Sequence, residues 1–474
     1  MKLAFFSPLN PIQSGISDYS EELLSALGQS TVGGRAVEVD LFIDKGYKPS
    51  SRELAGKFDV MAASGFGRVV STYDAIVYQM GNSPAHAYIY EALLKYPGVV
   101  VMHEFILHHL RIWMALNGGK RREYLALMET RYGEEGREAA RRVLLGQFPE
   151  ALFKYPLSDE VIGAAKGVIV HSKYMEGLVK GVRAEVPVGV VPMGVPLPPR
   201  ISKEVARARL GIDPEMFLIT SVGHLNPYKR VSATLRAFKA LLMEVPNARY
   251  LLVGSRSPNY DPARQIEMLE LSDRVKTTGY VAAEELGYYL AASDVCLNLR
   301  WPTAGETSAS LLRIMGAGVP VLVSRTGSFE ELPDDAVGKI DVGEIEEELL
   351  LEYLLLLARR PDVREAMSEA ARRYVGEQHT LEGAARGYLE FLTSMSGKQE
   401  GVDIVVPRLP EAEGPVITQA SKPEVTVEAS KVERHEEDPI AILAEAAAEL
   451  GISDADGVSL AGVAEAVRDI MPEA

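Results

Sequence analysis

Four short loops in this sequence combine glycine or histidine with charged and hydroxyl side chains, each soon after an apolar run. The first loop contains Gly15, Ser17 and Asp18, where a helical pattern starts. Glycine lets a ligand approach the backbone closely, and the free N–H groups at a helix start favour an anion. Taken alone, this loop is better explained as an ordinary strand-to-helix turn capped by Ser17 or Asp18.

The second loop begins with His103-Glu104, straight after the apolar stretch Val99–Met102. This position places an imidazole at the carboxyl end of a predicted strand, where the ligands of α/β folds bind. The alternative is a hydrogen-bonded histidine near a domain edge with no part in chemistry. His108 and His109 follow and Glu104 is four residues from His108, but no second pair of strong ligands is evident. We therefore predict no metal site here.

The third loop contains Gly223 and His224 and places two cations, Lys229 and Arg230, at the start of a helix. Cations at a helix start oppose the helix dipole. A bound anion such as a diphosphate would remove this conflict, whereas the alternative is a solvated pair of basic side chains. The unfavourable position of the cations favours the anion-binding interpretation.

The fourth loop contains Gly305, Glu306, Thr307 and Ser308 and opens another helix. Backbone N–H groups at Thr307 and Ser308 are predicted to point at the same anion as Lys229, and the Glu306 carboxylate can accept from sugar hydroxyls. The alternative for Thr307 and Ser308 is a plain helix cap. Two such loops that converge from neighbouring strands are a stronger indication of a site than either alone.

Two series of alternating strand-like and helix-like stretches position these loops. The strand-like stretches are Lys2–Phe6, Val37–Ile43, Ala75–Tyr78, Val99–Met102, Gly167–Val170 and Val188–Val191 in the first series, and Phe217–Val222, Arg249–Val253, Val275–Thr278, Val295–Leu299 and Val319–Ser324 in the second. Such alternation predicts an α/β protein with parallel sheets and helices on both faces. The proline-rich stretch 191–199 is a natural hinge, so two doubly wound halves are expected to face each other across a ligand-binding cleft. Between the strands of the first half, 111–145 has a helical composition with breaks at Gly118-Gly119 and Gly133.

The composition limits the class of partner. The 474 residues include 66 acidic and 50 basic side chains, a net charge of −16, which argues against nucleic acid. Cys296 is the single cysteine, so no intrachain disulfide is possible and a cytoplasmic location is expected. No targeting signal is evident, and the leucine-rich stretch Leu349–Leu357 is too short to span a bilayer.

The end of the chain differs from the rest. From Lys398 to Ala474 there are 17 acidic and 6 basic residues, and no aromatic residue follows Phe391. We predict a disordered acidic linker over 396–438. A short helical segment is predicted over 439–474, and it is too small for a core of its own, so it is expected to dock on a partner. An acidic pair in this segment, Asp454 and Asp456, is interpreted as a helix cap rather than a metal ligand.

The order and spacing of several segments resemble family 4 of the retaining, nucleotide-sugar-dependent glycosyltransferases over about residues 1–395. The matching segments are Gly15–Tyr19, His103-Glu104, Val168–Ser172, Val191–Val195, Gly223–Lys229, Ala292–Val295 and Gly305–Pro320. The resemblance implies the GT-B fold of two Rossmann-like domains. It assigns 1–195, with a return helix at about 378–395, to the acceptor domain and 196–377 to the donor-nucleotide domain.

The resemblance also assigns roles to the basic residues of the third loop. Lys229 matches the family's lysine on the donor diphosphate. The family's arginine is replaced by His224, and Arg230 stands where the family has glycine, so charge is expected to have moved along the loop. The donor-binding residues implied are Gly15, Gly223, His224, Lys229, Arg230, Gly279, Tyr280, Val281, Gly305, Glu306, Thr307, Ser308 and Arg313.

The family's paired glutamates are altered in this chain. Arg313 occupies the position of the second glutamate, which normally holds the ribose hydroxyls, and it serves either the donor or a structural ion pair. The first glutamate position falls on Gly305, with Glu306 one residue later. The chain is therefore predicted to be a divergent branch of the family.

The acceptor side is predicted to involve Ser17, Asp18, His103 and Glu104, with His103, Lys229 and Glu306 as the catalytic group. The resemblance implies front-face attack by the acceptor, with the diphosphate taking its proton and with no metal or other cofactor. Positioning and neutralisation of leaving-group charge are then the protein's contribution.

We therefore expect a hexosyltransferase that uses a nucleoside-diphosphate sugar, with a glycan, lipid-linked or small-molecule acceptor. The basic side chains within 120–122 and 137–142 are interpreted as a solvated helix face rather than as a membrane-surface contact. The altered glutamates and the acidic end of the chain leave a second hypothesis, a non-catalytic binding or scaffold subunit. A third hypothesis keeps the fold and changes the reaction to sugar-nucleotide epimerisation.

Overall fold

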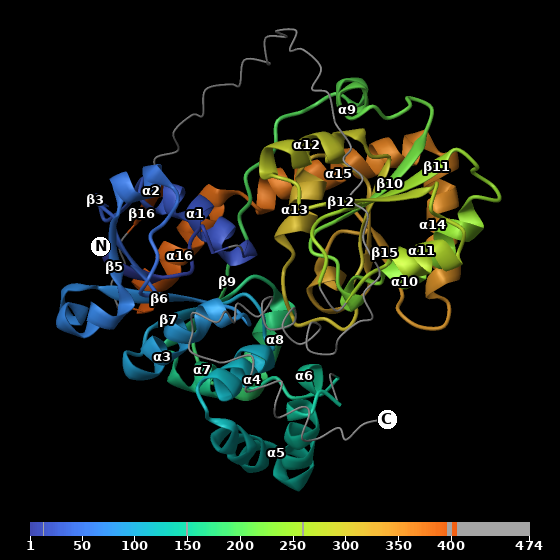
Figure 1. Cartoon of the computed structure of the whole chain (residues 1–474). Coiled ribbons are helices and arrows are strands. Elements are labelled where there is room, and N and C mark those ends of the chain that lie inside the picture. The colour runs from blue at the N-terminus through green and yellow to red at the C-terminus, as the bar shows by residue number, and fades with distance from the viewer. Residues whose placement is uncertain (13, 148–149, 258–259, 396–400, 405–474) are drawn as a thin grey trace. The chain divides into compact units, whose positions relative to one another are not determined.

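The computed structural model describes residues 1–404 except 13, 148–149, 258–259 and 396–400 (Figure 1). Its first sheet has seven parallel strands in the order β5-β4-β1-β6-β7-β8-β9. Their bounds are β1 Lys2–Phe6, β4 Glu38–Ile43, β5 Asp59–Ala62, β6 Ala75–Met80, β7 Val99–Met102, β8 Gly167–Val170 and β9 Val188–Val190. The strand-like runs of the first series all lie in this sheet, whereas β5 was not predicted, because its polar start hides the apolar pattern.

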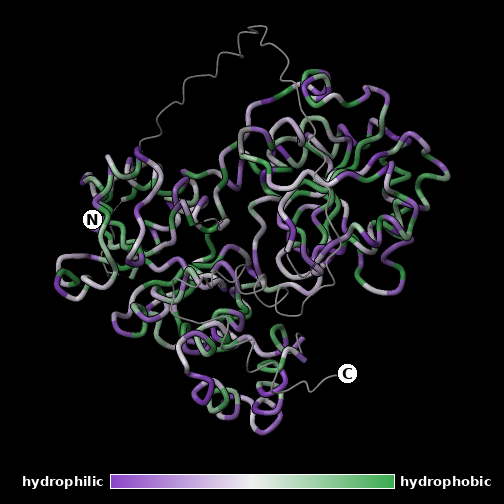
Figure 2. The backbone as a smooth tube through the Cα atoms, in the orientation of Figure 1, coloured by the Kyte–Doolittle hydropathy of each residue, from purple (hydrophilic) through white to green (hydrophobic). Residues whose placement is uncertain are grey.

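Both faces of the first sheet are buried, as a parallel sheet requires. In β7, Val99 and Val101 pack on one face with residues of α1 (Gly15–Leu27) and α16 (Leu381–Met395). Val100 and Met102 pack on the other face with α3 (Ala87–Lys95), α7 (Asp159–Ala164) and α8 (Lys173–Val182). A continuous apolar run is therefore the sequence signature of this strand, and the hydrophobic colour follows such runs in Figure 2.

The second sheet has six parallel strands in the order β12-β11-β10-β13-β14-β15. The strands are β10 Phe217–Val222, β11 Ala248–Val253, β12 Val275–Gly279, β13 Val295–Asn298, β14 Val321–Ser324 and β15 Gly338–Ile340. The helices are α9 Lys203–Leu210, α10 Val231–Leu241, α11 Ala263–Met268, α12 Ala283–Ala292, α13 Ala309–Gly316, α14 Glu346–Arg359 and α15 Pro361–Gln378. The leucine-rich stretch is α14, which buries Leu350, Leu354 and Leu357 against the sheet.

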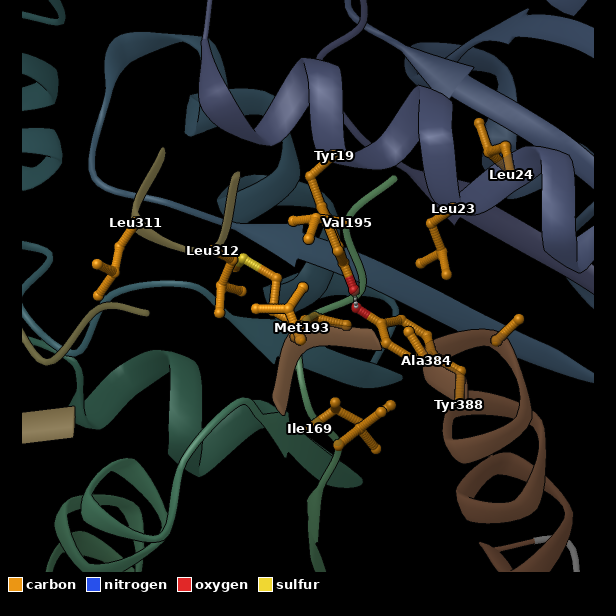
Figure 3. Packing of buried hydrophobic residues seen from close by; sticks show 14 of the residues in the cluster. Tyr19, Leu23, Leu24, Ile169, Met193, Val195, Leu311, Leu312, Ala384 and Tyr388 are labelled. Carbon is orange, nitrogen blue, oxygen red and sulfur yellow. Dashed lines mark hydrogen bonds between the residues drawn. The ribbon is translucent and has the colours of Figure 1, made fainter. Parts of the chain in front are cut away.

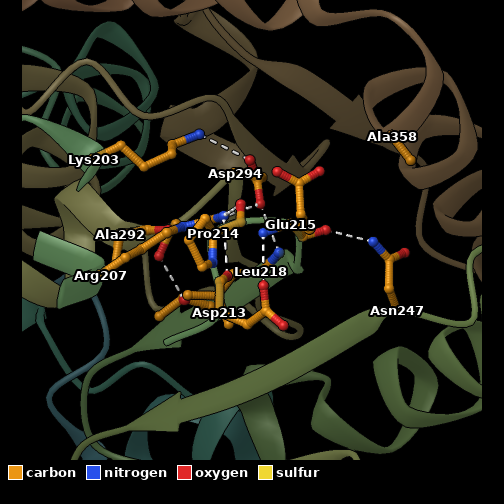
Figure 4. A network of polar contacts seen from close by, with 12 residues as sticks. Lys203, Arg207, Asp213, Pro214, Glu215, Leu218, Asn247, Ala292, Asp294 and Ala358 are labelled. Atoms are coloured by element: carbon orange, nitrogen blue, oxygen red, sulfur yellow. Dashed lines mark hydrogen bonds and ion pairs between the residues drawn. The ribbon is translucent and has the colours of Figure 1, made fainter. Parts of the chain in front are cut away.

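A carboxylate at the end of α12 ties three parts of this domain together (Figure 4). Asp294 accepts hydrogen bonds from the Arg207 guanidinium at 2.7 Å and from the backbone N–H of Leu218 at 2.6 Å, and its other oxygen accepts from Lys203 at 2.8 Å. Arg207 also donates to the Ala292 carbonyl at 3.0 Å. This carboxylate, which belongs to one of the family-like segments, therefore anchors α9 and the start of β10.

The helical insertion between β7 and β8 breaks where the glycines predict. Helix α4 (His108–Asn117) ends before Gly118-Gly119, and α5 (Arg121–Leu144) is kinked at Gly133, whose φ of 68° is outside the helical region. The insertion continues into α6 (Ala151–Lys154) and has its own small core.

The return helix α16 lies against the first sheet, as the resemblance implies. The Tyr388 hydroxyl is 3.1 Å from that of Tyr19 on α1 (Figure 3). The Phe391 ring occupies a notch that two glycines leave open, because a Cβ at Gly167 or Gly189 would lie 3.0 or 2.6 Å from it. The first domain is therefore completed by residues from the far end of the described chain.

A small antiparallel sheet was not predicted. It joins β2 (Ser30–Val32) and β3 (Arg35–Ala36) to β16 (Val402–Ile404), with Val402 opposite Val32. The predicted linker over 396–438 therefore includes three residues that form a strand, since Val402 and Ile404 suit an edge pairing. The rest of that linker from 405 onward, and the helical segment over 439–474, lie outside the described residues.

Candidate functional site

The predicted loops follow the carboxyl ends of β1, β7, β10 and β13. The second and fourth loops are in direct contact, because the Phe105 N–H donates to the Ala304 carbonyl at 2.7 Å. Gly305, with φ of 87°, sits at this contact, and a Cβ there would lie 2.6 Å from the Met175 sulfur. The structure thus brings the residues after His103 beside the loop that carries Glu306.

Lys229 ends a short 3₁₀ turn, Pro227–Lys229, which Asn226 caps by accepting from the Tyr228 N–H at 3.1 Å. Its ammonium group lies over Gly223, whose φ of 113° only glycine readily adopts. Burial, and then the positive charge of Arg300, lowers the pKa of Lys229 to about 7, although Glu306 acts in the opposite direction. Within the described residues the ammonium makes no ion pair, so an anionic ligand is the partner it lacks.

Arg300 is the functional candidate that the sequence analysis missed. It follows β13 and is 9% exposed. Its guanidinium pairs with Glu306 and donates to Asn298 Oδ1 at 3.2 Å and to Ser308 Oγ at 3.0 Å. Its Nε is buried without a partner among the described residues. A cation directly after an apolar strand is the signal that identifies such a residue.

Glu306 is held by its own loop. One carboxylate oxygen pairs with Arg300, and the other accepts from Thr303 Oγ1 at 3.0 Å and from the Ala304 N–H at 2.7 Å. Burial works against ionisation, but the charge and hydrogen bonds of Arg300 and the hydrogen bond of Thr303 outweigh it, so the pKa of Glu306 is lowered. The structure therefore gives Glu306 a clear task in fixing Arg300, and its contact with a sugar stays a prediction.

The hydroxyl residues of the fourth loop, Thr307 and Ser308, lie at the start of α13. Ser308 caps this helix by accepting from the Leu311 N–H at 3.3 Å, which is the helix-cap alternative given in the sequence analysis, and it also accepts from Arg300. Thr307 and Ser308 line a small cavity of about 40 Å³ together with His171 and Ser172.

His103 is buried between two rings, Tyr19 and His171, whose centroids are 5.2 and 5.1 Å away. Its Nε2 is 2.7 Å from the Gln79 side-chain oxygen. Burial, followed by the charges of His171 and His86, holds the pKa of His103 well below its usual value. His103 is therefore a neutral, oriented imidazole near physiological pH.

Glu104 has the opposite shift. Burial, and then the negative charge of Glu306, raises the pKa of Glu104 to about 7, while Asn82 and Arg300 act in the other direction. The interactions between charges link Glu104 to the same group as Lys229, Arg300 and Glu306. Two members of this group, Lys229 and Glu104, titrate near neutrality, which is typical of functional sites.

His108 has a structural role. Its Nδ1 is 2.7 Å from the Tyr155 carbonyl oxygen and its Nε2 is 2.6 Å from the Tyr124 hydroxyl. Both ring nitrogens are thus occupied, and the spacing between Glu104 and His108 does not form a ligand pair.

The first loop is capped differently from either option in the sequence analysis. Ser14 caps α1 by accepting from the Ser17 N–H at 3.0 Å. The Ser17 hydroxyl is 2.9 Å from that of Ser14, and Asp18 accepts from the Asn10 side chain at 3.1 Å. These side chains satisfy one another locally, because Ser14 stands one residue before the helix, where a cap belongs.

Two predicted donor contacts have partners within the protein. His224 lies between Ser255 and Ser257, with each ring nitrogen 2.9 Å from a hydroxyl oxygen. The Arg230 guanidinium pairs with Glu346 at the start of α14. Arg300 rather than Arg230 therefore contributes the charge that acts on Lys229, because Arg230 has φ of 55° and its side chain reaches α14 instead.

Arg313 forms an ion pair with Glu22 on α1 at 2.6 Å. Of the two roles proposed for it, the structure shows the structural one. Gly279, with φ of 74°, ends β12, and it is followed by Tyr280, which is 72% exposed, and by Val281, which packs on the core. A nucleotide-base contact at these three residues stays a prediction.

Two parallel Rossmann-like sheets in one chain, with candidate site loops at the carboxyl ends of their strands, define the GT-B class. Solved structures with the same fold include sucrose-phosphate synthase from Thermosynechococcus elongatus, with TM-score 0.58 and 17% identity over 84% of this chain and 99% of that one. Another is HepE from Anabaena in complex with UDP, with TM-score 0.59 and 16% identity over 83% of this chain and 99% of that one.

Residues 202–374 match the family model of the glycosyl transferases group 1, so this domain is similar to that family. The alpha-monoglucosyldiacylglycerol synthase of Streptococcus pneumoniae is 27% identical over 42% of this chain and 46% of its own length. The corresponding synthase of Acholeplasma laidlawii is 22% identical over 38% of this chain and 46% of its own length. The chain thus spans about half the length of these curated relatives. None of the helices in the described part of the chain is long and apolar enough to cross a membrane.

Proposed function

We propose that this protein is a retaining hexosyltransferase that uses a nucleoside-diphosphate sugar as donor. The observation that carries the proposal is a pair of cations, the half-buried Lys229 and the buried Arg300, after two adjacent strands of the group 1 domain. The lowered pKa of Lys229 means that nearby negative charge does not offset the cost of burying its ammonium group. A bound diphosphate would supply that negative charge.

The chemistry follows from where charge develops. When the bond between the sugar C1 and the diphosphate oxygen of the donor breaks, negative charge builds on the diphosphate oxygens. Cations that are already in place stabilise this charge without reorganisation, which is the largest contribution in many enzymes. Glu306 supports this by holding the Arg300 guanidinium through a carboxylate pair.

On the acceptor side, His103 and Glu104 are proposed to position the acceptor hydroxyl and the transferred sugar. With its Nε2–H donated to Gln79, the His103 ring presents Nδ1 as an acceptor for a hydroxyl group. Front-face attack would pass the acceptor's proton to the leaving diphosphate oxygen. Residues 1–195 with 378–395 are then the acceptor domain, and 196–377 the donor domain.

The identity of the substrates extends the proposal. UDP bound to the Anabaena neighbour and the monoglucosyldiacylglycerol for which two relatives are named support a nucleotide sugar such as UDP-glucose and a lipid or glycan acceptor. We propose a cytoplasmic enzyme that needs no metal, because Lys229 and Arg300 bring the positive charge that a divalent ion supplies elsewhere. Full activity in a chelator would support this, and loss of activity restored by Mg²⁺ would contradict it.

The test is binding and turnover on the full chain. A panel of nucleoside diphosphates and their sugars is screened by thermal shift against the wild type, Lys229→Ala, and the exposed control Lys239→Ala. A ligand at a hundred times its Kd stabilises a protein by about 2.7 kcal/mol, which is readily measured. A shift that Lys229→Ala abolishes and Lys239→Ala keeps supports the donor site, and equal shifts in all three proteins contradict it.

Turnover then separates the functions. Release of free sugar or transfer to an added acceptor supports the transferase. Binding without any turnover supports the non-catalytic subunit, which the pairing of Arg313 with Glu22 at the ribose-binding position favours as second candidate. Conversion of the donor sugar without an acceptor would identify an epimerase.

A further inference from the structure

The edge of the second sheet that lies away from the proposed donor site carries a cavity of about 370 Å³. It is bounded by the end of α9, the first half of β11, the loop before β12, and α12. Its size is at the lower end of the range for small-molecule pockets. The cations of the proposed donor site, Lys229 and Arg300, follow the carboxyl ends of β10 and β13, whereas the cations of this cavity lie at the amino ends of β11 and β12, so the two groups of cations are distinct. Thr278, beside the predicted base contact at Gly279, also lines the cavity.

The floor of the cavity is apolar. Leu218, Leu251 and Tyr289 line it, and Leu251 is only half-buried although β11 is an interior strand. The residues of β11 that alternate with it, Tyr250 and Leu252, are fully buried on the other face. Because parallel sheets bury both faces, the partly covered Leu251 marks a place where the covering helices leave the sheet open.

The rim of the cavity is cationic. The strand register puts Arg249 opposite Leu218 and Lys276 opposite Leu251, so these side chains share the face of the cavity. Arg274 lies directly before β12, next to Arg249. Burial and then the charge of Arg274 hold the pKa of Arg249 below its usual value, although Asp273 and Asp213 act in the opposite direction. Two guanidinium groups thus stand close together at the mouth of an apolar cavity.

Neither guanidinium has a carboxylate partner within the described part of the chain. Arg249 donates to the Ala248 carbonyl at 2.9 Å, and Arg274 donates to the Pro246 carbonyl at 2.7 Å. Asp273 also lines the cavity, but it is exposed and forms no ion pair with either arginine among these residues. The remaining N–H groups of both forks are available to an anion, which a guanidinium binds through two parallel hydrogen bonds.

We propose that this cavity is a second ligand site, which takes a small organic phosphate with its apolar body over Leu218 and Leu251 and its phosphate between Arg249 and Arg274. The cavity matches such a ligand in both size and charge. The site is separate from the donor site and would exist even if the chain were not a transferase.

The test uses phenyl phosphate as probe, with inorganic phosphate and benzyl alcohol as its anionic and apolar halves. Binding to the full chain is measured by calorimetry in the wild type, Arg249→Gln, Arg274→Gln and Lys229→Ala, with Arg256→Gln as the exposed control. We expect phenyl phosphate to bind at least about tenfold more tightly than either half, and to lose about tenfold in affinity when either rim arginine is changed. Lys229→Ala and Arg256→Gln keep the wild-type affinity.

Two outcomes overturn the proposal. Equal affinities for phenyl phosphate and inorganic phosphate would mean that the apolar floor takes no part. Loss of binding in Lys229→Ala with none in Arg249→Gln and Arg274→Gln would place the probe in the donor site. If the arginine variants fail to fold, methyl NMR of the wild type decides: shifts of Leu218 and Leu251 with phenyl phosphate support the site, and unchanged signals contradict it.

Discussion

The two domains differ in the charge of the polar groups that they leave without partners. In the first domain, His103 is bonded to Gln79, and the buried side-chain atoms without a partner among the described residues are mostly uncharged, such as Gln79 Nε2, His86 Nε2 and His171 Nε2. In the second domain, the Lys229 ammonium and the Arg300 Nε lack partners among the described residues. An unmet donor in a buried site costs free energy, so it marks the place where a ligand completes the structure. The difference indicates an anion on the second domain and a preformed neutral surface on the first.

Removal of the Lys229 charge is expected to have the largest effect. Lys229→Ala should lower kcat/KM by about 10²–10³-fold, the range found when one preorganised donor is removed from a developing charge. Lys239→Ala, which changes an exposed lysine of the same domain, should leave the kinetics unchanged. Steady-state kinetics with a nucleotide sugar measure both, and a loss below threefold in Lys229→Ala would refute the unmet-cation argument.

Removal of the Arg300 charge tests how much the ion pair with Glu306 contributes to the free energy of unfolding. Arg300→Gln leaves the largely buried Glu306 without its cation, and we expect a loss of about 3 kcal/mol in the free energy of unfolding. Urea unfolding followed by the fluorescence of Trp301, in a Trp113→Phe background, reports on this site.

The double variant Arg300→Gln with Glu306→Gln is the matched control for that measurement. It removes both charges and should recover much of the lost stability. Equal stability of the single variant and the wild type would show that the pair is not buried in solution.

The pH dependence of donor binding sharpens the comparison further. In the protein without a bound donor, the pKa of Lys229 is about 7, so the Lys229 side chain loses its charge as the pH rises above 7. A bound diphosphate favours the ammonium, and therefore affinity should fall by up to tenfold per pH unit above 7. Nucleotide sugars suit the measurement, because their diphosphate has no proton to lose in this range.

A second group complicates that profile. Glu104, whose pKa is also about 7, gains negative charge over the same range and would weaken binding in the same direction. Calorimetry of Glu104→Gln and of Lys229→Met separates the two. The slope should persist in Glu104→Gln and vanish in Lys229→Met, and the reverse pattern would assign the titration to Glu104.

The ion pair between Arg313 and Glu22 is expected to contribute least, about 1 kcal/mol or less, because both side chains are partly exposed. A double-mutant cycle with Arg313→Gln and Glu22→Gln measures their coupling in the free energy of unfolding. Donor affinity is the second readout. If Arg313→Gln weakens donor affinity and Glu22→Gln does not, Arg313 binds the donor as well as Glu22, and its role is not purely structural.

Some of this site could be predicted from the sequence and some could not. Strands such as β7 and β8 are continuous apolar runs, and the breaks at Gly118-Gly119 and Gly133 need conformations that favour glycine, so local pattern identifies them. The partners of Arg230 and Arg313 could not be found in this way. Glu346 and Glu22 are distant in the sequence, and only the folded chain brings them near.

The role of Arg300 could not be predicted from the sequence for a related reason. The other charged residues of the donor site, Lys229 and Glu306, belong to glycine loops at helix starts, whereas Arg300 follows a strand. Its burial depends on Phe329, whose ring lies 4.9 Å from the guanidinium, and on Glu306, so its role is a property of tertiary packing.

The notch that holds Phe391 has a consequence for how the protein is made. Gly167 and Gly189 are synthesised about 200 residues before the ring that covers them. At 5–20 residues per second, a ribosome needs roughly 10–40 s to cover that distance. During that time the first domain waits with an open groove along β8 and β9, while the whole second domain is being produced. A nascent chain of this protein therefore presents its unfinished domain to chaperones until α16 emerges.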